Sequence, residues 1–208
     1  MTEYTRGLHR IVTFPAIYEA IQAVLGGPES RRRIAMAVLS GLEGRSVVEI
    51  GCGPGTWSAF LTNTAHYLGV DYNARHIESA LRHFGTEHTQ FYCGDIADPQ
   101  VIGQIGKVDC VVGIGILHHL DDDIARTMLD NIKSILGFGG EFVGIEPVYH
   151  RHQNPIARLL NHLDSGRNIR TEQGYRSLFG ANMAIKTEIR KDMLRVPYSH
   201  CIIRALIS

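Results

Sequence analysis

The chain has 208 residues, enough for one α/β domain with a sizeable hydrophobic core. Its 21 basic and 21 acidic residues cancel, so there is no excess positive charge to hold a polyanion, and we expect no nucleic-acid partner. No apolar run reaches the ~18 residues of a membrane span, and the start of the chain lacks the apolar segment of a signal peptide, so we expect a cytoplasmic protein with no membrane association.

The four cysteines are Cys52, Cys93, Cys110 and Cys201, and none of them forms a C-x-x-C pair. Three of them fall in predicted strands or in a glycine-rich turn. We therefore expect reduced, mostly buried thiols and no metal site.

Residues 1–45 are predicted to be helical and to precede the core of the domain. Apolar side chains recur there with a period near 3.6 residues, and a second helix is predicted to begin at Pro28 and to end near Gly41 and Gly44. In one interpretation this segment only covers a face of a sheet. In the other, Tyr18 and its neighbours close over a ligand.

A glycine-rich turn follows the first predicted strand, whose residues 47–50 include three β-branched apolar side chains. Gly51, Gly53 and Gly55 alternate through the turn, and glycine lets the backbone bend sharply and approach a ligand closely. A helix is predicted to begin near Thr56, with its free N–H groups facing any anion above the turn.

Strands and helices alternate through the middle of the chain. Strands are predicted at residues 66–71, 89–93, 108–114 and 141–146, and helices at 74–84, 99–105 and 122–136. Pro147 is expected to end the last of these strands. Such alternation makes a parallel sheet with right-handed crossovers, and ligands bind outside the carboxyl ends of its strands.

The tail of the chain has a different pattern. A helix is predicted at residues 156–163, a polar stretch at 164–170, and a second helix at 171–179 with Thr171 as its cap. Residues 184–190 and 200–207 alternate as two strands, which we expect to form an antiparallel pair at the end of the sheet.

Acidic residues lie at the predicted strand ends. Asp71 follows Gly51 by 20 residues, and a carboxylate there can accept hydrogen bonds from both hydroxyls of a ribose; otherwise it is a helix cap or a turn acid. Asp95 can accept from the exocyclic amine of an adenine, with Ile96 against the ring, or be a plain turn residue. Glu49, in an apolar strand, needs a partner such as a backbone N–H or a ligand ammonium.

Together these features resemble the class I S-adenosylmethionine-dependent methyltransferases, over roughly residues 45–147. The motifs that carry the resemblance are Glu49-x-Gly51-x-Gly53-x-Gly55, Asp71, Gly94-Asp95-Ile96, Asp109, Leu117-His118-His119-Leu120 and Gly139-Gly140.

The resemblance implies a Rossmann-like, doubly wound α/β sheet of seven strands, mostly parallel, in the order 3-2-1-4-5-7-6 with an antiparallel last strand. It implies one methyltransferase domain over residues 1–208, with a helical N-terminal cap at 1–45, a cofactor-binding core at 46–147, and an acceptor-side insertion with the last strands at 148–208.

The resemblance also implies S-adenosyl-L-methionine as the cofactor, S-adenosyl-L-homocysteine as its product, and a small-molecule acceptor. In this interpretation the glycines approach the methionine part, Asp71 holds the ribose, and Asp95 and Ile96 frame the adenine. The implied cofactor-binding set is Glu49, Gly51, Cys52, Gly53, Gly55, Trp57, Asp71, Tyr72, Asp95, Ile96, Gly113, Ile114 and Gly115.

A hydroxyl acceptor would need a general base near the end of the fourth strand, and His118 and His119 are the nearest candidates, with His119 preferred. The opposite interpretation is that both belong to a supporting loop. The acceptor pocket is expected to use Tyr18 and residues of the tail, namely Asp164, Arg167, Arg170, Tyr175, Tyr198 and His200.

Three other functions compete with methyl transfer to a small molecule. A nicotinamide-dependent dehydrogenase would place a third glycine where Thr56 stands, and a nucleic-acid amino-methyltransferase would carry an Asn- or Asp-Pro-Pro-aromatic motif where residues 113–117 read G-I-G-I-L. A cofactor-bound protein of this fold with a non-methylating role, as a cyclase-like catalyst or a regulatory binder, remains the alternative. A homodimer is also compatible with the sequence.

Overall fold

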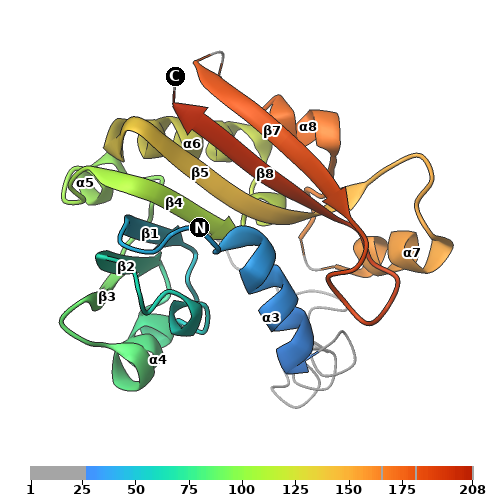
Figure 1. The fold of residues 1–208 in the computed structure, drawn as a ribbon. Coiled ribbons are helices and arrows are strands. Elements are labelled where there is room, and N and C mark those ends of the chain that lie inside the picture. The colour runs from blue at the N-terminus through green and yellow to red at the C-terminus, as the bar shows by residue number, and fades with distance from the viewer. Residues whose placement is uncertain (1–26, 165, 181, 208) are drawn as a thin grey trace.

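The computed structural model describes residues 27–164, 166–180 and 182–207. Tyr18 and the helix predicted before Pro28 lie outside these residues. In the part of the chain that the structure describes, eight strands form one sheet (Figure 1). They are β1 (Ser46–Ile50), β2 (His66–Asp71), β3 (Thr89–Cys93), β4 (Val108–Ile114), β5 (Leu136–Tyr149), β6 (Arg170–Thr171), β7 (Met183–Arg190) and β8 (His200–Ile207).

The strand order is β3-β2-β1-β4-β5-β8-β7, and the two-residue β6 pairs with β5 beside this path. The first five strands are parallel, while β8 is antiparallel to both of its neighbours. The predicted fold class and the predicted antiparallel pair at the end of the sheet are therefore confirmed.

Helices cover both faces of the sheet. They are α3 (Gly27–Val38), α4 (Ala74–Phe84), α5 (Pro99–Ile102), α6 (Asp122–Ile135), α7 (Pro155–Leu163) and α8 (Glu172–Arg176), with 3-10 turns η1 (Ser58–Phe60) and η2 (Leu117–His119). Within the described part of the chain, no helix combines the length and apolar character needed to cross a membrane.

Two apolar cores lie on opposite faces of the sheet, and Figure 1 shows α3 and α6 on either side of it. Side chains of β1 alternate between the cores, because successive residues of a strand point to opposite faces. Val48 and Ile50 pack with α5, α6 and α8, whereas Val47 packs with α3 and α4. This two-sided burial explains why the central strands read as continuous apolar runs.

Two predictions about local structure were wrong. The helix expected from Thr56 is only the short turn η1, without a side-chain cap, so no helix N-terminus faces the glycine turn. The strand expected at 141–146 is also longer: β5 continues past Pro147, which lies opposite His200 of β8. The Pro147 carbonyl accepts a hydrogen bond from the Tyr175 hydroxyl at 2.8 Å.

Candidate active site at the carboxyl edge of the sheet

The glycine turn after β1 leaves one stretch of backbone open. Gly53 has φ +54°, and a Cβ atom there would meet nothing within 4 Å. Gly51 is also in the left-handed region, with φ +65°, but a Cβ atom there would lie 2.5 Å from Ile116 Cδ1. Gly51 therefore serves packing, whereas Gly53 can be approached by a ligand.

Asp71, at the end of β2, ties this turn to the next one. Asp71 is buried, with 7% of the residue exposed. Oδ2 accepts from the Gly53 N–H at 2.9 Å, and Oδ1 accepts from the Asn73 N–H at 2.8 Å. Each carboxylate oxygen has a second lone pair, so two further hydroxyls can donate to it. The neighbouring Tyr72 is 82% exposed.

The segment after β3 is held from two sides. Asp95 is exposed, and its Oδ1 accepts from the Ala97 N–H at 2.9 Å in a local turn. Ile96 is 7% exposed and packs in the core beside α6. Asn131 of α6 donates to the Ala97 carbonyl at 2.9 Å. Only an edge of Ile96 is therefore open to a ligand ring.

Glu49 is a buried acid beneath the glycine turn. It accepts a hydrogen bond from the Tyr67 hydroxyl, and it is 1% exposed. Burial raises the pKa of Glu49 to about 8, with the charge of Asp71 adding to the rise and the Tyr67 bond opposing it. The Glu49 carboxyl can therefore lose its proton when a cation approaches.

The end of β4 forms the other side of this edge. Gly113 is buried, and a Cβ atom there would crowd Ile116 and Phe142 at 3.2 Å. Gly115 has φ +66°, and its N–H donates to the Ile145 carbonyl at 2.9 Å. The predicted set also includes Cys52, which is buried; Trp57, whose ring centroid lies 6.1 Å from that of Phe60; and Ile114, which is half-buried.

Glu146 organises the loop that follows β4. It is fully buried, and its Oε1 accepts from the backbone N–H groups of Ile116 and Leu117 at 2.9 and 2.8 Å. Its Oε2 accepts from the His118 backbone N–H at 3.2 Å and lies 2.6 Å from His118 Nδ1. A buried carboxylate persists only when hydrogen bonds replace its lost hydration.

His118 is held between two carboxylates. Its Nδ1 faces Glu146, and its Nε2 lies 3.5 Å from Asp164 Oδ1. Burial disfavours its positive charge, but Asp164 and Glu146 outweigh burial and raise the pKa of His118 to about 9. At neutral pH both ring nitrogens therefore carry protons, which leaves His118 no lone pair with which to act as a base.

His119, in contrast to His118, is a neutral and exposed histidine. It is exposed, and among the described residues nothing hydrogen-bonds to its ring. Its ring centroid lies 4.0 Å from that of His118. Burial of part of the ring lowers the pKa of His119, and the charge of His118 lowers it further. At neutral pH it is a neutral imidazole with a free lone pair at the carboxyl edge of the sheet.

The predicted acceptor residues of the tail separate into two groups. Arg167 is exposed and forms no hydrogen bond or ion pair with any described residue. Arg170 is fully engaged instead: its guanidinium donates to the Leu117 and Leu120 carbonyls, each at 2.8 Å, and to Asp122 Oδ1 at 2.7 Å. It fastens the tail to the loop after β4 and offers no free donor fork to an anion.

Tyr198 and His200 lie inside the protein. The Tyr198 hydroxyl is 3.4 Å from Asp164 Oδ2, and its ring centroid lies 5.0 Å from that of His200. Burial lowers the pKa of His200 to about 4, so its ring is neutral. Asp164 thus contacts both His118 and Tyr198, while Tyr175 is buried against β5.

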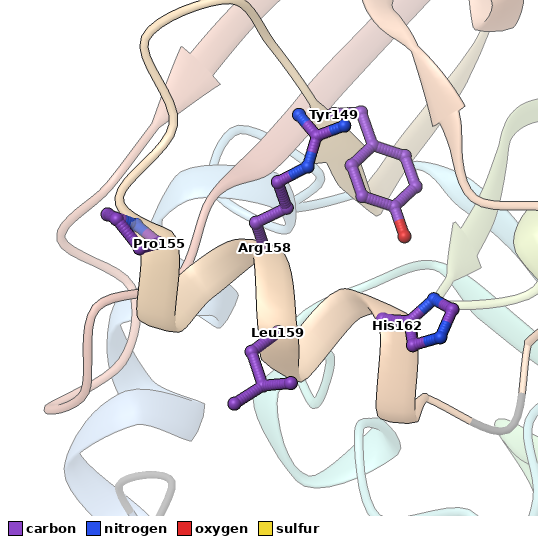
Figure 2. A pocket seen from close by; sticks show the side chains of 5 residues that line it. All are labelled: Tyr149, Pro155, Arg158, Leu159 and His162. Carbon is purple, nitrogen blue, oxygen red and sulfur yellow. The ribbon is translucent and has the colours of Figure 1, made fainter.

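Sequence reasoning missed a cavity of about 430 Å³ beside α7. Figure 2 shows it between Tyr149, at the end of β5, and four residues of α7. The helix residues are Pro155, Arg158, Leu159 and His162. Their spacing of three and four residues marks one helix face, and this is the only sign of the cavity that the sequence carries.

Residues 47–140 match a family model described as a methyltransferase domain. A curated relative, phosphoethanolamine N-methyltransferase of Triticum aestivum, is 27% identical over 124 residues, which cover 56% of this chain and 23% of the relative. This chain thus spans about a quarter of the length of the curated relatives it matches.

Solved structures resemble the whole fold. The N-methyltransferase NodS from Bradyrhizobium japonicum WM9 is 18% identical, with a TM-score of 0.64 over 86% of this chain and 94% of that one. The magnesium protoporphyrin IX methyltransferase of Synechocystis PCC 6803, solved with bound S-adenosylhomocysteine, is 20% identical, with a TM-score of 0.61 over 92% of this chain and 85% of that one.

Proposed function

We propose that this chain, which belongs to the class I S-adenosylmethionine-dependent methyltransferases, transfers the methyl group of S-adenosylmethionine to a nucleophilic atom of a small molecule. The observation that carries the proposal is the juxtaposition of the open Gly53 backbone and the Asp71 carboxylate at the edge where β1, β2 and β4 end. Ligands of parallel sheets bind at this edge.

The residues at the edge fit the cofactor. The Gly53 turn can take its amino-acid part, because no side chain fills the space there. Asp71 has lone pairs for two ribose hydroxyls, and Asp95 lies at the end of the next strand, on the adenine side. The region from Gly113 to Gly115 then borders the reactive end. We propose these roles together with the division of the chain at residues 45 and 147.

When bound, S-adenosylmethionine would supply an activated methyl group: the acceptor lone pair would bond to the methyl carbon as the carbon–sulfur bond broke, and the electron pair of that bond would stay on sulfur to give S-adenosylhomocysteine. The protein then has two tasks. It aligns the acceptor in line with the methyl carbon, and positioning of this kind can contribute up to ~7–11 kcal/mol. It also accepts the proton that the acceptor loses.

We assign the proton-accepting role to His119. It is exposed at the end of β4 and neutral at pH 7, as a base requires. His118 holds the loop in place through Glu146 and Asp164 and is not part of this assignment. The curated relatives are named for N-methylation of phosphoethanolamine, which favours an amine acceptor here, since an ammonium group must lose a proton before its nitrogen can attack.

The test is calorimetry with S-adenosylhomocysteine and its 2′-deoxy analogue on Asp71→Asn. The parent should prefer the ribose form, and the variant should lose that preference together with ~10-fold or more in affinity, as loss of a charge-assisted hydrogen bond implies. Asp123→Asn, at a position whose side chain is 99% exposed, is the control and should bind like the parent.

An unchanged ribose preference in folded Asp71→Asn would remove the ribose assignment. Methyl transfer is then followed with labelled cofactor and a panel of amines that includes phosphoethanolamine. Tight cofactor binding without product from any acceptor would favour the non-methylating alternative.

A further inference from the structure

The cavity beside α7 holds a cation without a counter-charge. The Arg158 guanidinium lies 5.7 Å from the centroid of the Tyr149 ring, and no carboxylate of the described residues pairs with it. Figure 2 shows Arg158 and Tyr149 facing one another, with His162 one turn further along the helix. The unpaired guanidinium, the phenol hydroxyl and the imidazole are three groups that can donate hydrogen bonds to an anion.

The remaining wall of the cavity is apolar. Pro155 and Leu159 line it, and Leu159 is 57% exposed although it is a large aliphatic residue. A concave site with apolar walls and a few convergent polar groups is the usual form of a small-ligand site, and about 430 Å³ lies within the usual size range. The cavity therefore suits a small molecule with one anionic end.

Both walls of the cavity connect directly to the loop that carries His119. Only two residues of β5 separate Tyr149 from Glu146, which holds that loop. On the other wall, α7 ends at Leu163, and the next residue, Asp164, contacts His118. A ligand anchored in the cavity can thus extend toward the carboxyl edge of the sheet.

We propose that this cavity binds the anionic group of the methyl acceptor, a carboxylate or a phosphate monoester, with Arg158 as its charge partner and Tyr149 and His162 as hydrogen-bond donors. This proposal rests on the proposed function, because it takes the ligand to be the acceptor. It assigns the specificity for a charged acceptor to a site separate from the cofactor edge.

The test measures binding directly, without turnover. Protein loaded with S-adenosylhomocysteine is titrated with 4-aminobutyrate, 3-aminopropyl phosphate and the neutral 4-aminobutanol, while NMR follows the ring signals of Tyr149 and His162. At least one anion should bind 10-fold or more tightly than the alcohol and should shift the ring signals of both residues. The anion that does so shows whether the site prefers a carboxylate or a phosphate.

Three variants show whether Arg158 is responsible. Arg158→Gln should abolish the preference for the anion, and Arg158→Lys should keep part of it because the charge remains. Arg82→Gln, which removes an exposed arginine of α4, should behave like the parent. Equal binding of all three probes, or an anion preference that survives Arg158→Gln, would overturn the proposal.

The two proposals can fail separately. Arg158-dependent anion binding without methyl transfer to any acceptor would keep the cavity as an anion-binding site, but it would remove the proposed function and the assignment of the bound anion to a methyl acceptor. Methyl transfer to an anionic acceptor with an unchanged KM in Arg158→Gln would support the proposed function and remove the cavity assignment.

Discussion

At the scale of single residues, two adjacent histidines have opposite chemistry. His118 is buried between Glu146 and Asp164, whereas His119 is exposed and has no hydrogen-bond partner among the described residues. The same side chain is thereby a fixed cation at one position and a free base at the next. The difference comes from carboxylates that lie 28 and 46 positions further along the chain.

The paired state of His118 predicts how stability depends on pH. Its folded pKa is about 9, above the ordinary value of 6.5, so its contribution to stability is complete below pH 6.5 and is lost as pH rises through 9. His118→Gln should lower the free energy of unfolding at pH 6 by on the order of 3 kcal/mol, since breaking a buried pair leaves carboxylates uncompensated.

Thermal unfolding at pH 6, 7.5 and 9 checks this, because the gap between parent and variant should narrow steadily as pH rises. His88→Gln, at an exposed position just before β3, is the control and should unfold like the parent. A gap that stays constant with pH would contradict the charged pair.

The free state of His119 predicts a kinetic effect. His119→Gln should lower kcat for an acceptor that must lose a proton by about 10²–10⁴-fold, the usual contribution of a general base, with unchanged affinity for S-adenosylhomocysteine. The acidic limb of the parent rate profile should fall below pH 6.5, because the pKa of His119 is lowered. Unchanged turnover in the variant would remove the base assignment.

At the scale of elements, the loop between α7 and β6 is fitted closely over His118. Gly166 is buried, and a Cβ atom there would lie 1.9 Å from His118 Cδ2. Its N–H donates to Asp164 Oδ1 at 2.7 Å, and the Asn168 N–H donates to the His118 carbonyl at 3.0 Å. The loop can hold Asp164 against the histidine only if residue 166 has no side chain.

Gly166→Ala should therefore displace this loop and lower the free energy of unfolding by about 1–3 kcal/mol, as overpacking usually does. Gly106→Ala is the matched control, because a Cβ atom there meets nothing within 4 Å and the backbone φ is ordinary. That control should be neutral or slightly stabilising. Urea unfolding of both variants is the measurement, and equal stabilities would show that the loop does not rest on His118.

Another element shows where periodicity fails. Residues 57–61 have helical spacing of their apolar side chains, yet only the turn η1 forms. Ser58 Oγ donates to the Gly55 carbonyl, and Thr64 Oγ1 donates to the Leu61 carbonyl, so side chains take up backbone acceptors at both ends. A stretch this short gains too few hydrogen bonds to offset helix nucleation.

At the scale of the whole molecule, the sequence predicts the strands and helices of the sheet better than it predicts the site. The strands at 66–71, 89–93 and 108–114 and the helix at 74–84 lie where the apolar pattern predicted them. The strand order came from the resemblance to a family, and the structure confirms it. Local burial patterns repeat reliably because a strand or a helix must always present one face to a core.

The positions of only some polar residues could be predicted from the sequence. Asp71 lies at the sheet edge beside the glycine turn, as expected, because strand ends of a parallel sheet share one edge. Arg170 was expected in the acceptor pocket, but its guanidinium donates to carbonyls about 50 residues earlier in the chain. Arg158 and Tyr149 were not predicted, because neither belongs to a motif and only the packing of α7 against β5 brings them together.

The sequence by itself determined the alternation of strands and helices, the glycine turn, and the acidic residue that follows the second strand. Each of these depends on neighbours within about one turn or one strand, where backbone sterics and side-chain period act. Only the tertiary structure decided which histidine is charged, which arginine is free and where a cavity opens. Those properties depend on desolvation and on charges from distant segments, whose distances no local pattern records.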